Sequence, residues 1–353
     1  MSGTDRPAEG WTYCDVRPRS APDLAPDLNP RRASLIRVVR AKWVNGTVLH
    51  YRLTPADEQA GGPPPQLDAV RDAFAAWKAL GIGLDFVEVA DPAAAEVRVT
   101  FDQSDGSWSY VGRDVLGIAH DEPTMNFGWD LTTPWGRVTA LHEIGHTLGF
   151  PHEHQNPNAG IVWDEPRVIA EFSAPPNSWS EAQVRHNILR KLDPAEVEGS
   201  TWDPESVMHY PFDPGLILQP ERYGREGVPA PDGLSEDDEA WVLRWYPGLE
   251  PDPPRLEPGR SVPLELAAGG QADLVVEPAA TRDYRIGTFG DADTLLVVFE
   301  EVDGEPSFLA GDDDSGQDRN ALVTVRMRAG RRYVVRVRLY SAWTSGSTAV
   351  MLW

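Results

Sequence analysis

Three histidines and a glutamate stand close together near the middle of this chain, in the run HEIGHTLGFPH at residues 142–152. His142 and His146 are four residues apart, so on a helix both imidazoles leave the same face, one turn apart. Gly149 permits a left-handed turn just past the helix end, and His152 can then return as a third ligand. Three neutral imidazoles leave the fourth position of a tetrahedral zinc ion to water, which is the arrangement of a catalytic site.

Glu143 directly follows the first of these histidines. Its carboxylate can reach a water molecule at the metal but not the metal itself, which suits a general base. With eight histidines in 353 residues, five fixed positions coincide by chance in about one chain in 30,000. Zinc is favoured over other metals because three imidazoles beside a carboxylate suit a redox-inert Lewis acid. The alternative is a helix with surface histidines and an unrelated glycine.

Periodicity predicts regular elements before this motif. Apolar residues alternate at 49–53 and at 97–101, which predicts two strands, and a less regular alternation at 84–89 predicts a third. An apolar stripe at helical spacing runs from Leu67 to Trp77 and is closed by Gly81. Strands mixed with helices indicate an α/β or α+β layer and not an all-β fold.

Three more helices are expected around and after the motif. The motif helix covers residues 134–148, with Thr133 as N-cap and a proline in the first turn. A second helix follows Ser180, whose capping box Gln183 completes. The third follows Ser235 and stops before a proline at 247.

Composition divides the chain into four segments. Residues 1–33 are rich in Pro, Asp and Arg and predict an extended leader. Residues 34–247 form the mixed domain that carries the motif, and residues 248–260 form a proline-rich linker. Residues 261–353 contain short alternating segments separated by turns, which predicts a separate antiparallel β-sandwich.

The overall charge excludes several classes of function. The net charge of -23 and the pI near 4.7 disfavour binding to nucleic acid or to an anionic membrane surface. No apolar run is long enough to insert into a membrane, and the amino terminus lacks the apolar core of a secretory signal.

Residue counts carry two further inferences. A single cysteine excludes a disulfide within the chain. Three lysines against 29 arginines point to a GC-rich bacterial genome, and the chain is expected to be a monomer.

The long form of the motif, HExxHxxGxxH, resembles that of the metzincin metallopeptidases. SVMHY at residues 206–210 resembles the methionine turn of that clan, and that of the astacin family in particular. The astacin-like stretches are also Lys42-Trp43 with Tyr51, residues 108–113, and Phe150 with Glu153 around the third histidine. The resemblance covers about residues 34–247 and is to a bacterial astacin-like or matrixin-like metzincin.

This resemblance implies a zinc-dependent endopeptidase with a twisted mixed sheet beside an active-site helix. Its implied zinc ligands are His142, His146 and His152. Glu143 would be the base, Met208 would form the methionine turn, and Tyr210 would be a switchable zinc ligand that turns to donate to the oxyanion. Extended proteins or peptides would be the substrates, cleaved internally. Secretion is expected from the family, although no signal peptide is present.

The leader contains the only cysteine, Cys14, in the run WTYCDVRP at residues 11–18. A thiolate is a strong zinc ligand and could displace the catalytic water, which would keep the enzyme latent as a zymogen by a cysteine switch. Asp15 could play the same part, because astacin leaders use an aspartate. The third interpretation is an ordinary free cysteine in a flexible tail. Arg31-Arg32 offers a place for an activating cut.

Two further segments carry predictions. Gly117, Ile118, Ala119 and His120 are expected to form the edge strand that pairs with an extended substrate, the alternative being an ordinary buried strand. In the carboxy-terminal segment, residues 311–316 with Asp291 and Asp293 present carboxylates that would suit calcium, or else form solvated loops. The pattern from Asp293 to Leu352 resembles the prepeptidase carboxy-terminal sandwich.

The sequence therefore predicts a zinc endopeptidase whose water is activated by Glu143 and which its amino-terminal segment holds latent. The rival interpretation is an inactive zinc protein whose sandwich binds a partner or a glycan, with the zinc domain as scaffold. The complete set of ligands, base and methionine turn favours the peptidase.

Overall fold

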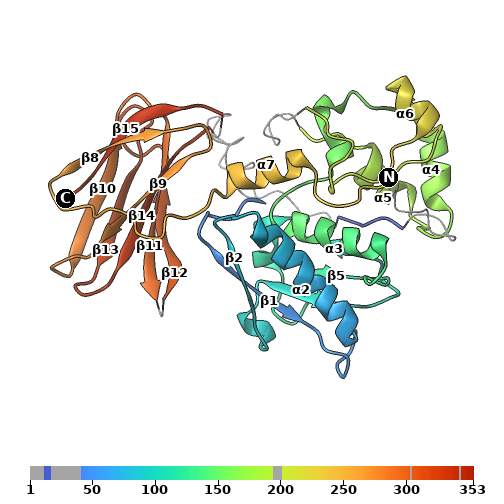
Figure 1. The fold of residues 1–353 in the computed structure, drawn as a ribbon, viewed down its shortest axis with the longest axis horizontal. Helices are drawn as coiled ribbons and strands as arrows, with labels where there is room; N and C mark the ends of the chain where they lie inside the picture. The colour runs from blue at the N-terminus through green and yellow to red at the C-terminus, as the bar shows by residue number, and fades with distance from the viewer. Residues whose placement is uncertain (1–11, 17–40, 194–200, 303, 342) are drawn as a thin grey trace. The chain divides into compact units, whose positions relative to one another are not determined.

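The computed structural model describes residues 12–16, 41–193, 201–302, 304–341 and 343–353 (Figure 1). Most of the predicted leader, including Arg31 and Arg32, lies outside these residues. The described residues divide into two compact units. The first holds those up to residue 43 together with 49–79 and 86–239, and the second holds 44–48, 80–85 and 240–353. The domain boundaries inferred from composition remain predictions. Among the described residues, no helix has both the length and the apolar character needed to cross a membrane.

A five-stranded sheet has the strand order β2-β1-β3-β5-β4. Its strands are β1 (Val48–Leu53), β2 (Asp85–Glu88), β3 (Val97–Thr100), β4 (Trp108–Ser109) and β5 (Met125–Asn126). β1 is parallel to β3 and β3 to β5, whereas β4 pairs antiparallel with β5. Every second residue of β1 is buried, as the apolar alternation predicts. The predicted mixed sheet is thereby confirmed.

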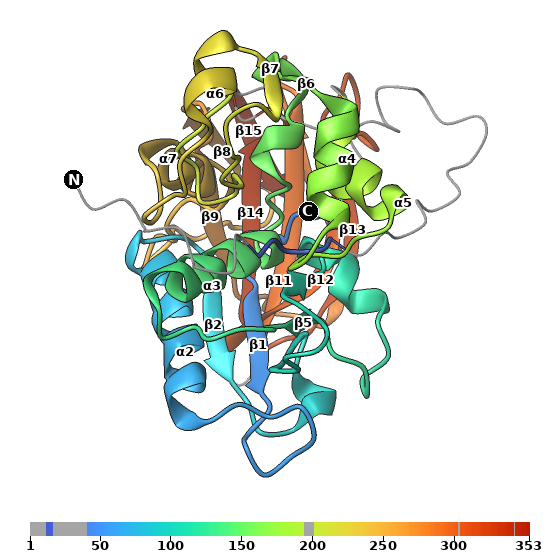
Figure 2. The same ribbon diagram turned by 90° about the vertical axis from the view of Figure 1, so that its right-hand side faces the viewer.

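Two helices flank this sheet (Figure 2). Helix α2 (Pro64–Ala79) packs its apolar stripe on β1, where the ring of Phe74 stacks on Tyr51 with centroids 4.3 Å apart. Helix α3 (Pro134–Thr147) contacts α2, and the indole of Trp77 donates to a backbone carbonyl of α3 at 3.1 Å. Both helices agree with the predicted ranges to within a few residues.

Shorter elements make up the rest of the first unit. β6 (Val162–Trp163) pairs antiparallel with β7 (Ile217–Gln219). The helices are α4 (Glu165–Ser173), α5 (Glu181–Val184), α6 (Glu221–Glu226) and the start of α7 (Glu236–Trp245). The predicted capping box between Ser180 and Gln183 starts α5, which passes after one turn into a π-helix at Arg185–Leu189. Apolar side chains of β6, β7, α4, α5 and the π-helix share one buried cluster that includes Phe172 and Phe212.

The prediction of an edge strand at Gly117–His120 is wrong. Residues Gly112–Gly117 form a 3₁₀-helix, and Ile118, Ala119 and His120 follow without strand pairing. The buried guanidinium of Arg98 donates to the carbonyls of Ile118 (3.4 Å) and Ala119 (3.1 Å), so a side chain and not a strand engages them. On this side of the sheet β4 is the edge strand.

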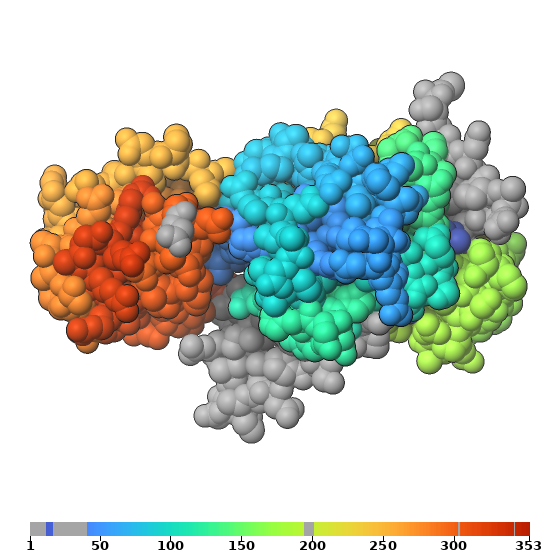
Figure 3. All heavy atoms as spheres, turned by 90° about the horizontal axis from the view of Figure 1, so that it is seen from below, coloured from blue at the N-terminus to red at the C-terminus, as the bar shows by residue number. Residues whose placement is uncertain are grey.

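The second unit contains two four-stranded antiparallel sheets. Their strand orders are β13-β10-β15-β8 and β12-β11-β14-β9. The strands are β8 (Ser261–Leu266), β9 (Gln271–Val276), β10 (Arg282–Phe289), β11 (Thr294–Val302), β12 (Glu305–Asp312), β13 (Leu322–Met327), β14 (Tyr333–Leu339) and β15 (Gly346–Leu352). Apolar residues of both sheets form one buried core. The predicted β-sandwich is confirmed, and its atoms, orange to red, pack closely on the face seen in Figure 3.

Candidate active site

Helix α3 positions the first two histidines and the glutamate of the motif. Thr133 caps the helix by accepting a hydrogen bond from the amide of Gly136, and a proline occupies the first turn, as predicted. His142 and His146 therefore lie one turn apart, with ring centroids separated by 4.7 Å. Both imidazoles and the side chain of Glu143 are buried.

A glycine turn brings the third histidine back to the helix. Gly149 has a φ of +101°, a conformation that side chains with a Cβ rarely adopt. The amide of Gly149 donates to the carbonyl of His146 (2.9 Å), and the amide of Phe150 donates to that of Gly145 (3.0 Å). The ring of His152 consequently lies 4.7 Å from the ring of His146.

The donor atoms of the three histidines converge. His142 Nδ1 contacts the carbonyl of Val207 and His146 Nδ1 that of Phe150, each at 2.7 Å, which fixes Nδ1 as the protonated nitrogen in both rings. Their Nε2 lone pairs are therefore free to bind a metal, and His142 Nε2 has no hydrogen-bond partner among the described residues. The Nε2 atoms of His146 and His152 are 3.1 Å apart.

The electrostatics of these rings also suit a metal site. Burial lowers the pKa of His142 to about 4. Burial, together with the neighbouring histidines, lowers the pKa of His146 and of His152. Neutral imidazoles are the form that binds a metal, and a cluster of buried nitrogens suits tetrahedral zinc.

The fourth group at this point is the thiol of Cys14. Its Sγ lies 3.3 Å from His152 Nε2 and 3.5 Å from His146 Nε2. One candidate donor atom from Cys14 and from each of the three histidines lies within 4.8 Å of every other. Three nitrogens and one sulfur at such distances match the donor set of a four-coordinate zinc. Burial raises the pKa of the Cys14 thiol in the absence of a metal.

A methionine turn lies beneath the histidines, as the sequence pattern predicts. Met208 is buried, and its sulfur packs against Gly145 of α3. The carboxylate of Asp238 in α7 holds this turn by accepting from Ser206 Oγ (2.6 Å) and from the amide of Val207 (2.7 Å). Asp238 therefore fixes the carbonyl of Val207, which in turn orients His142.

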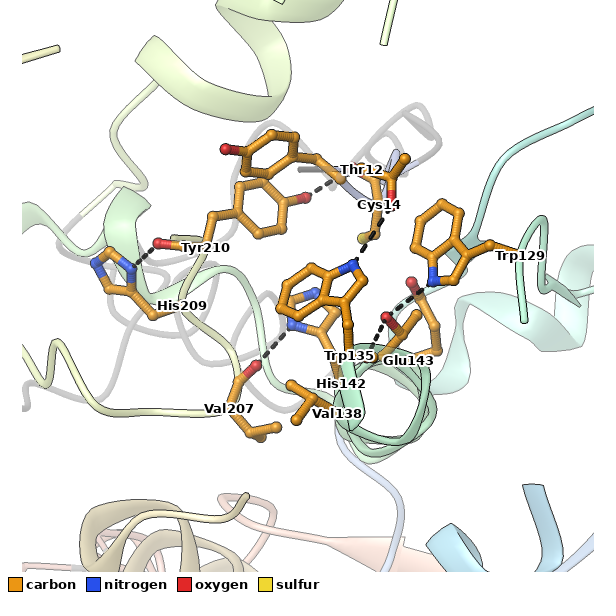
Figure 4. Close-up of a pocket in the computed structure, with 12 residues that line it drawn as sticks. Thr12, Cys14, Trp129, Trp135, Val138, His142, Glu143, Val207, His209 and Tyr210 are labelled. Atoms are coloured by element: carbon orange, nitrogen blue, oxygen red, sulfur yellow. Dashed lines mark hydrogen bonds between the residues drawn. The ribbon is translucent and has the colours of Figure 1, made fainter. Parts of the chain in front are cut away.

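Glu143 and Tyr210 lie on opposite sides of His142 and Cys14 (Figure 4). Neither carboxylate oxygen of Glu143 accepts a hydrogen bond from another described residue, and burial raises its pKa. The Tyr210 hydroxyl donates to the backbone carbonyl of Cys14 at 2.6 Å and lies 2.7 Å from His152 Nε2. Both groups line a pocket together with Trp129 and Trp135.

Thr12, Tyr13 and Cys14 of the leader line this pocket, and residues 12–16 form no helix or strand. The amide of Asp15 donates to the carbonyl of Ser107 (3.1 Å), directly before β4. Asn187 of the π-helix accepts from the amide of Val16 (3.1 Å) through Oδ1 and donates to the Asp15 carboxylate (2.6 Å) through Nδ2. The Asp15 carboxylate is therefore engaged by Asn187, while Cys14 is the leader residue at the histidines.

The structure brings together most of the predicted site, but not all of it. Gly117–His120 form no part of the sheet edge beside the leader. Of the two interpretations of the acidic loop at 311–316, the calcium site is not supported, and Asp312 instead accepts hydrogen bonds from Ser315 and from the amide of Leu322. The described residues show one cluster able to hold a metal, and it is the histidine site.

Sequence reasoning did not assign a role in the site to Asp238, Asn187, Trp129 or Trp135. Asp238 carried a usable signal, since Ser235 and Asp238 have the spacing of a helix cap. Asn187 carried none, because only tertiary folding brings the π-helix to the leader.

Comparison with known proteins identifies the relatives of the chain. The sequence model of the astacin family of peptidases matches residues 39–213. Bone morphogenetic protein 1 of Xenopus laevis is 35% identical over 155 residues, which are 40% of this chain and 19% of that protein. This chain thus spans about a fifth of the length of that curated relative.

Two solved structures match parts of the chain. Myroilysin, whose structure is known, has 33% sequence identity to this chain and a TM-score of 0.54. The match covers 60% of this chain and 98% of the myroilysin chain. The pre-peptidase C-terminal domain of a collagenase from Bacillus anthracis is 12% identical, with a TM-score of 0.26, and the match covers 30% of this chain and 99% of that domain. From the family match and the nearly complete coverage of myroilysin, we conclude that this chain belongs to the astacin family of metallopeptidases.

Proposed function

We propose that this protein is a zinc metalloendopeptidase that hydrolyses peptide bonds within extended proteins or peptides. The observation that carries the proposal is the convergence of three buried imidazole nitrogens beside the buried, unpartnered carboxylate of Glu143. Membership of the astacin family supports the same activity. His142, His146 and His152 would hold the zinc ion.

The chain's own groups then divide the chemistry. A zinc ion at the three histidines supplies a Lewis acid that polarises the scissile carbonyl. Glu143 accepts a proton from the attacking water and passes it to the leaving amine, for which its buried, unpartnered carboxylate is suited. Tyr210, released from the carbonyl of Cys14, donates its phenolic hydrogen where negative charge develops on the substrate oxygen.

The edge of the sheet at β4 would align the substrate. Peptides commonly add to a sheet edge through main-chain hydrogen bonds. The carbonyl of Ser107 already accepts such a bond from the amide of Asp15. Since the leader occupies this edge, a substrate would take its place.

We further propose that the leader keeps the enzyme latent through Cys14. The thiol lies against two of the three histidines and occupies the space that water and the substrate carbonyl need. A thiolate there would complete the zinc coordination. The leader would therefore block substrate in two ways: the Cys14 thiolate would bind the zinc ion, and the leader backbone covers the sheet edge at β4.

Cleavage of an unfolded protein by the full chain and by two variants tests both proposals. Cys14→Ala removes the ligand, and Asp15→Ala is the comparison variant, because it removes the contact of the leader with Asn187 and keeps the thiol. We expect chelator-sensitive cleavage by Cys14→Ala well above that of the intact chain and of Asp15→Ala. Equal chelator-sensitive cleavage by all three chains would reject the thiol lock and keep the peptidase.

The rival is an inactive zinc protein that acts as a scaffold. Absence of cleavage by Cys14→Ala and by a chain without residues 1–32, while both bind zinc, would favour it over the peptidase.

A further inference from the structure

The side chain of Tyr13 fills an aromatic pocket beside the candidate metal site. We call it the Tyr13 pocket and define it by Phe172, Trp179, Tyr210 and Phe212. The ring of Tyr13 lies 4.8 Å from Phe172, 5.1 Å from Tyr210, 6.4 Å from Phe212 and 6.5 Å from Trp179, measured between centroids. We propose that, once the leader departs, this pocket is a subsite that selects an aromatic substrate side chain close to the cleaved bond.

The inference rests on the proposed peptidase function, and it begins with the leader's position. Tyr13 directly precedes Cys14, whose thiol lies at the histidine nitrogens. A residue in the place of Tyr13 is therefore next to the residue that faces the zinc ligands. Whichever direction a substrate runs, a side chain in this pocket belongs to a residue within two positions of the cleaved bond.

The main-chain contacts of the leader do not depend on its side chains. The amide of Tyr13 donates to Asn177 Oδ1 (3.2 Å), that of Asp15 to the carbonyl of Ser107 (3.1 Å), and that of Val16 to Asn187 Oδ1 (3.1 Å). Any extended peptide carries such amides. The same groups are thus available to hold a substrate backbone, and the side-chain pocket then discriminates between sequences.

The chemistry of the Tyr13 pocket indicates which side chain it takes. Its walls are aromatic rings, which pair favourably with another ring in tilted or stacked geometry. The Tyr13 hydroxyl donates to the carbonyl of Pro211 at 2.9 Å, which is a polar contact at the end of the pocket. A tyrosine side chain can donate a hydrogen bond to the Pro211 carbonyl. Phenylalanine would pack against the same rings but make no hydrogen bond, and the Pro211 carbonyl would repel a carboxylate. The expected order of preference is tyrosine, then phenylalanine, then aliphatic residues.

Three walls of the Tyr13 pocket, Phe172, Trp179 and Phe212, also belong to the buried core of the first unit. Phe172 and Phe212 are almost completely buried, and Phe172 stacks on Trp179 with centroids 5.7 Å apart. Asp164 caps α4, the helix that carries Phe172. We expect departure of the leader to open the pocket while these three walls remain.

Matched peptides that differ at one position test the inference. The enzyme is the full chain with Cys14→Ala and Tyr13→Ala, which removes both the thiol and the side chain that fills the pocket. Peptides carry Tyr, Phe, Leu or Ala at each position within two residues of a fixed bond, and products are identified by mass spectrometry. At one position we expect kcat/KM for Tyr to exceed that for Ala by about tenfold.

A substitution in the Tyr13 pocket links this preference to its walls. Trp179→Ala should abolish most of the preference for Tyr, so that kcat/KM for the Tyr peptide falls toward that for the Ala peptide. Leu218→Ala, at an exposed position of the same unit, is the control and should keep the preference. Trp179→Leu is the second variant if Trp179→Ala does not fold, as judged by circular dichroism.

The outcomes separate this inference from the proposed function. Cleavage of all peptides at similar rates would overturn the aromatic subsite and leave the peptidase intact. A preference for Tyr that persists in both Trp179 variants would also overturn it, because the selectivity would then lie elsewhere. Absence of cleavage of every peptide, and of unfolded protein, would reject the peptidase and this inference together.

Discussion

At the scale of single residues, hydrogen bonds determine what each site histidine can do. His142 and His146 use Nδ1 on backbone carbonyls and present Nε2 inward. His152 differs, since its Nδ1 has no hydrogen-bond partner among the described residues. Two of the three candidate ligands are therefore oriented by the backbone, and the third is positioned by the turn at Gly149.

The role of Glu143 leads to a prediction in which metal binding and catalysis separate. In the Cys14→Ala background, Glu143→Gln should keep one zinc per chain, because the carboxylate is not a ligand. It should lower kcat by about 10²–10⁴-fold through loss of the base. Zinc content by atomic absorption and kcat on one peptide check this. Loss of zinc, or retention of full turnover, would contradict the assigned role.

Tyr210 should act on the transition state and not on substrate binding. In the same background, removal of its hydroxyl by Tyr210→Phe keeps the ring contacts and should lower kcat by about 10²–10³-fold with KM unchanged. Steady-state kinetics on one peptide measure both constants. An effect on KM alone would show that the hydroxyl binds the ground state.

At the scale of elements, the fit between α3 and the methionine turn is tight. A Cβ on Gly145 would overlap the sulfur of Met208, which is buried and cannot easily move. Glycine is therefore required at this point of the helix by close packing, although alanine is the better helix former.

Gly145→Ala should consequently destabilise the first unit. Overpacking costs about 1–3 kcal/mol, which exceeds the gain of about 1 kcal/mol in helix propensity. Thermal unfolding measures the change. In a Met208→Ala background the clash is absent, so the same substitution should there be neutral or stabilising. A similar cost in both backgrounds would mean that Met208 is not the obstacle.

The sequence was informative about elements wherever a local pattern determined them. The cap at Thr133, the capping box at Ser180 and the apolar alternation of β1 each involve residues close in sequence, and each was predicted. The edge strand at Gly117–His120 was predicted wrongly, since Arg98, about twenty residues away, engages its carbonyls. Strands β8, β9, β10 and β12 were not predicted, because charged residues and short turns interrupt their alternation.

The candidate site was predictable to the same extent. Fixed spacing on one helix and one turn identified His142, His146, His152 and Glu143. The choice between Cys14 and Asp15 was not predictable, because both could reach a metal and the preference depends on Asn187 binding the carboxylate. A contact across more than 170 residues leaves no periodic pattern in the sequence.

At the scale of the whole molecule, the chain passes between the two compact units five times, after residues 43, 48, 79, 85 and 239. The second unit therefore includes two short segments from the amino-terminal half. Within this unit, the buried Asn45 amide donates to the carbonyl of Pro247 (2.7 Å) and to the side chain of Gln271 (2.8 Å). A single cut in the chain cannot separate the units cleanly.

Asn45→Ala should for this reason destabilise the second unit, although Asn45 lies about 200 residues before Pro247 and Gln271 in the sequence. Loss of both hydrogen bonds leaves two acceptors unpaired and should cost about 1–2 kcal/mol. Denaturant unfolding followed by tryptophan fluorescence measures it, with Ser347→Ala at an exposed position of β15 as control. Equal stability of the two variants would show that Asn45 contributes nothing to this unit.

Cys14 makes the rate at which the leader opens measurable. It is the only cysteine of the chain and is buried where the leader crosses the pocket. A thiol-reactive dye has therefore a single target, which it reaches only while the leader is lifted away. The rate of labelling, extrapolated to excess dye, equals the rate at which the leader opens. The lifetime of the closed state can thus be timed in solution before any substrate is known.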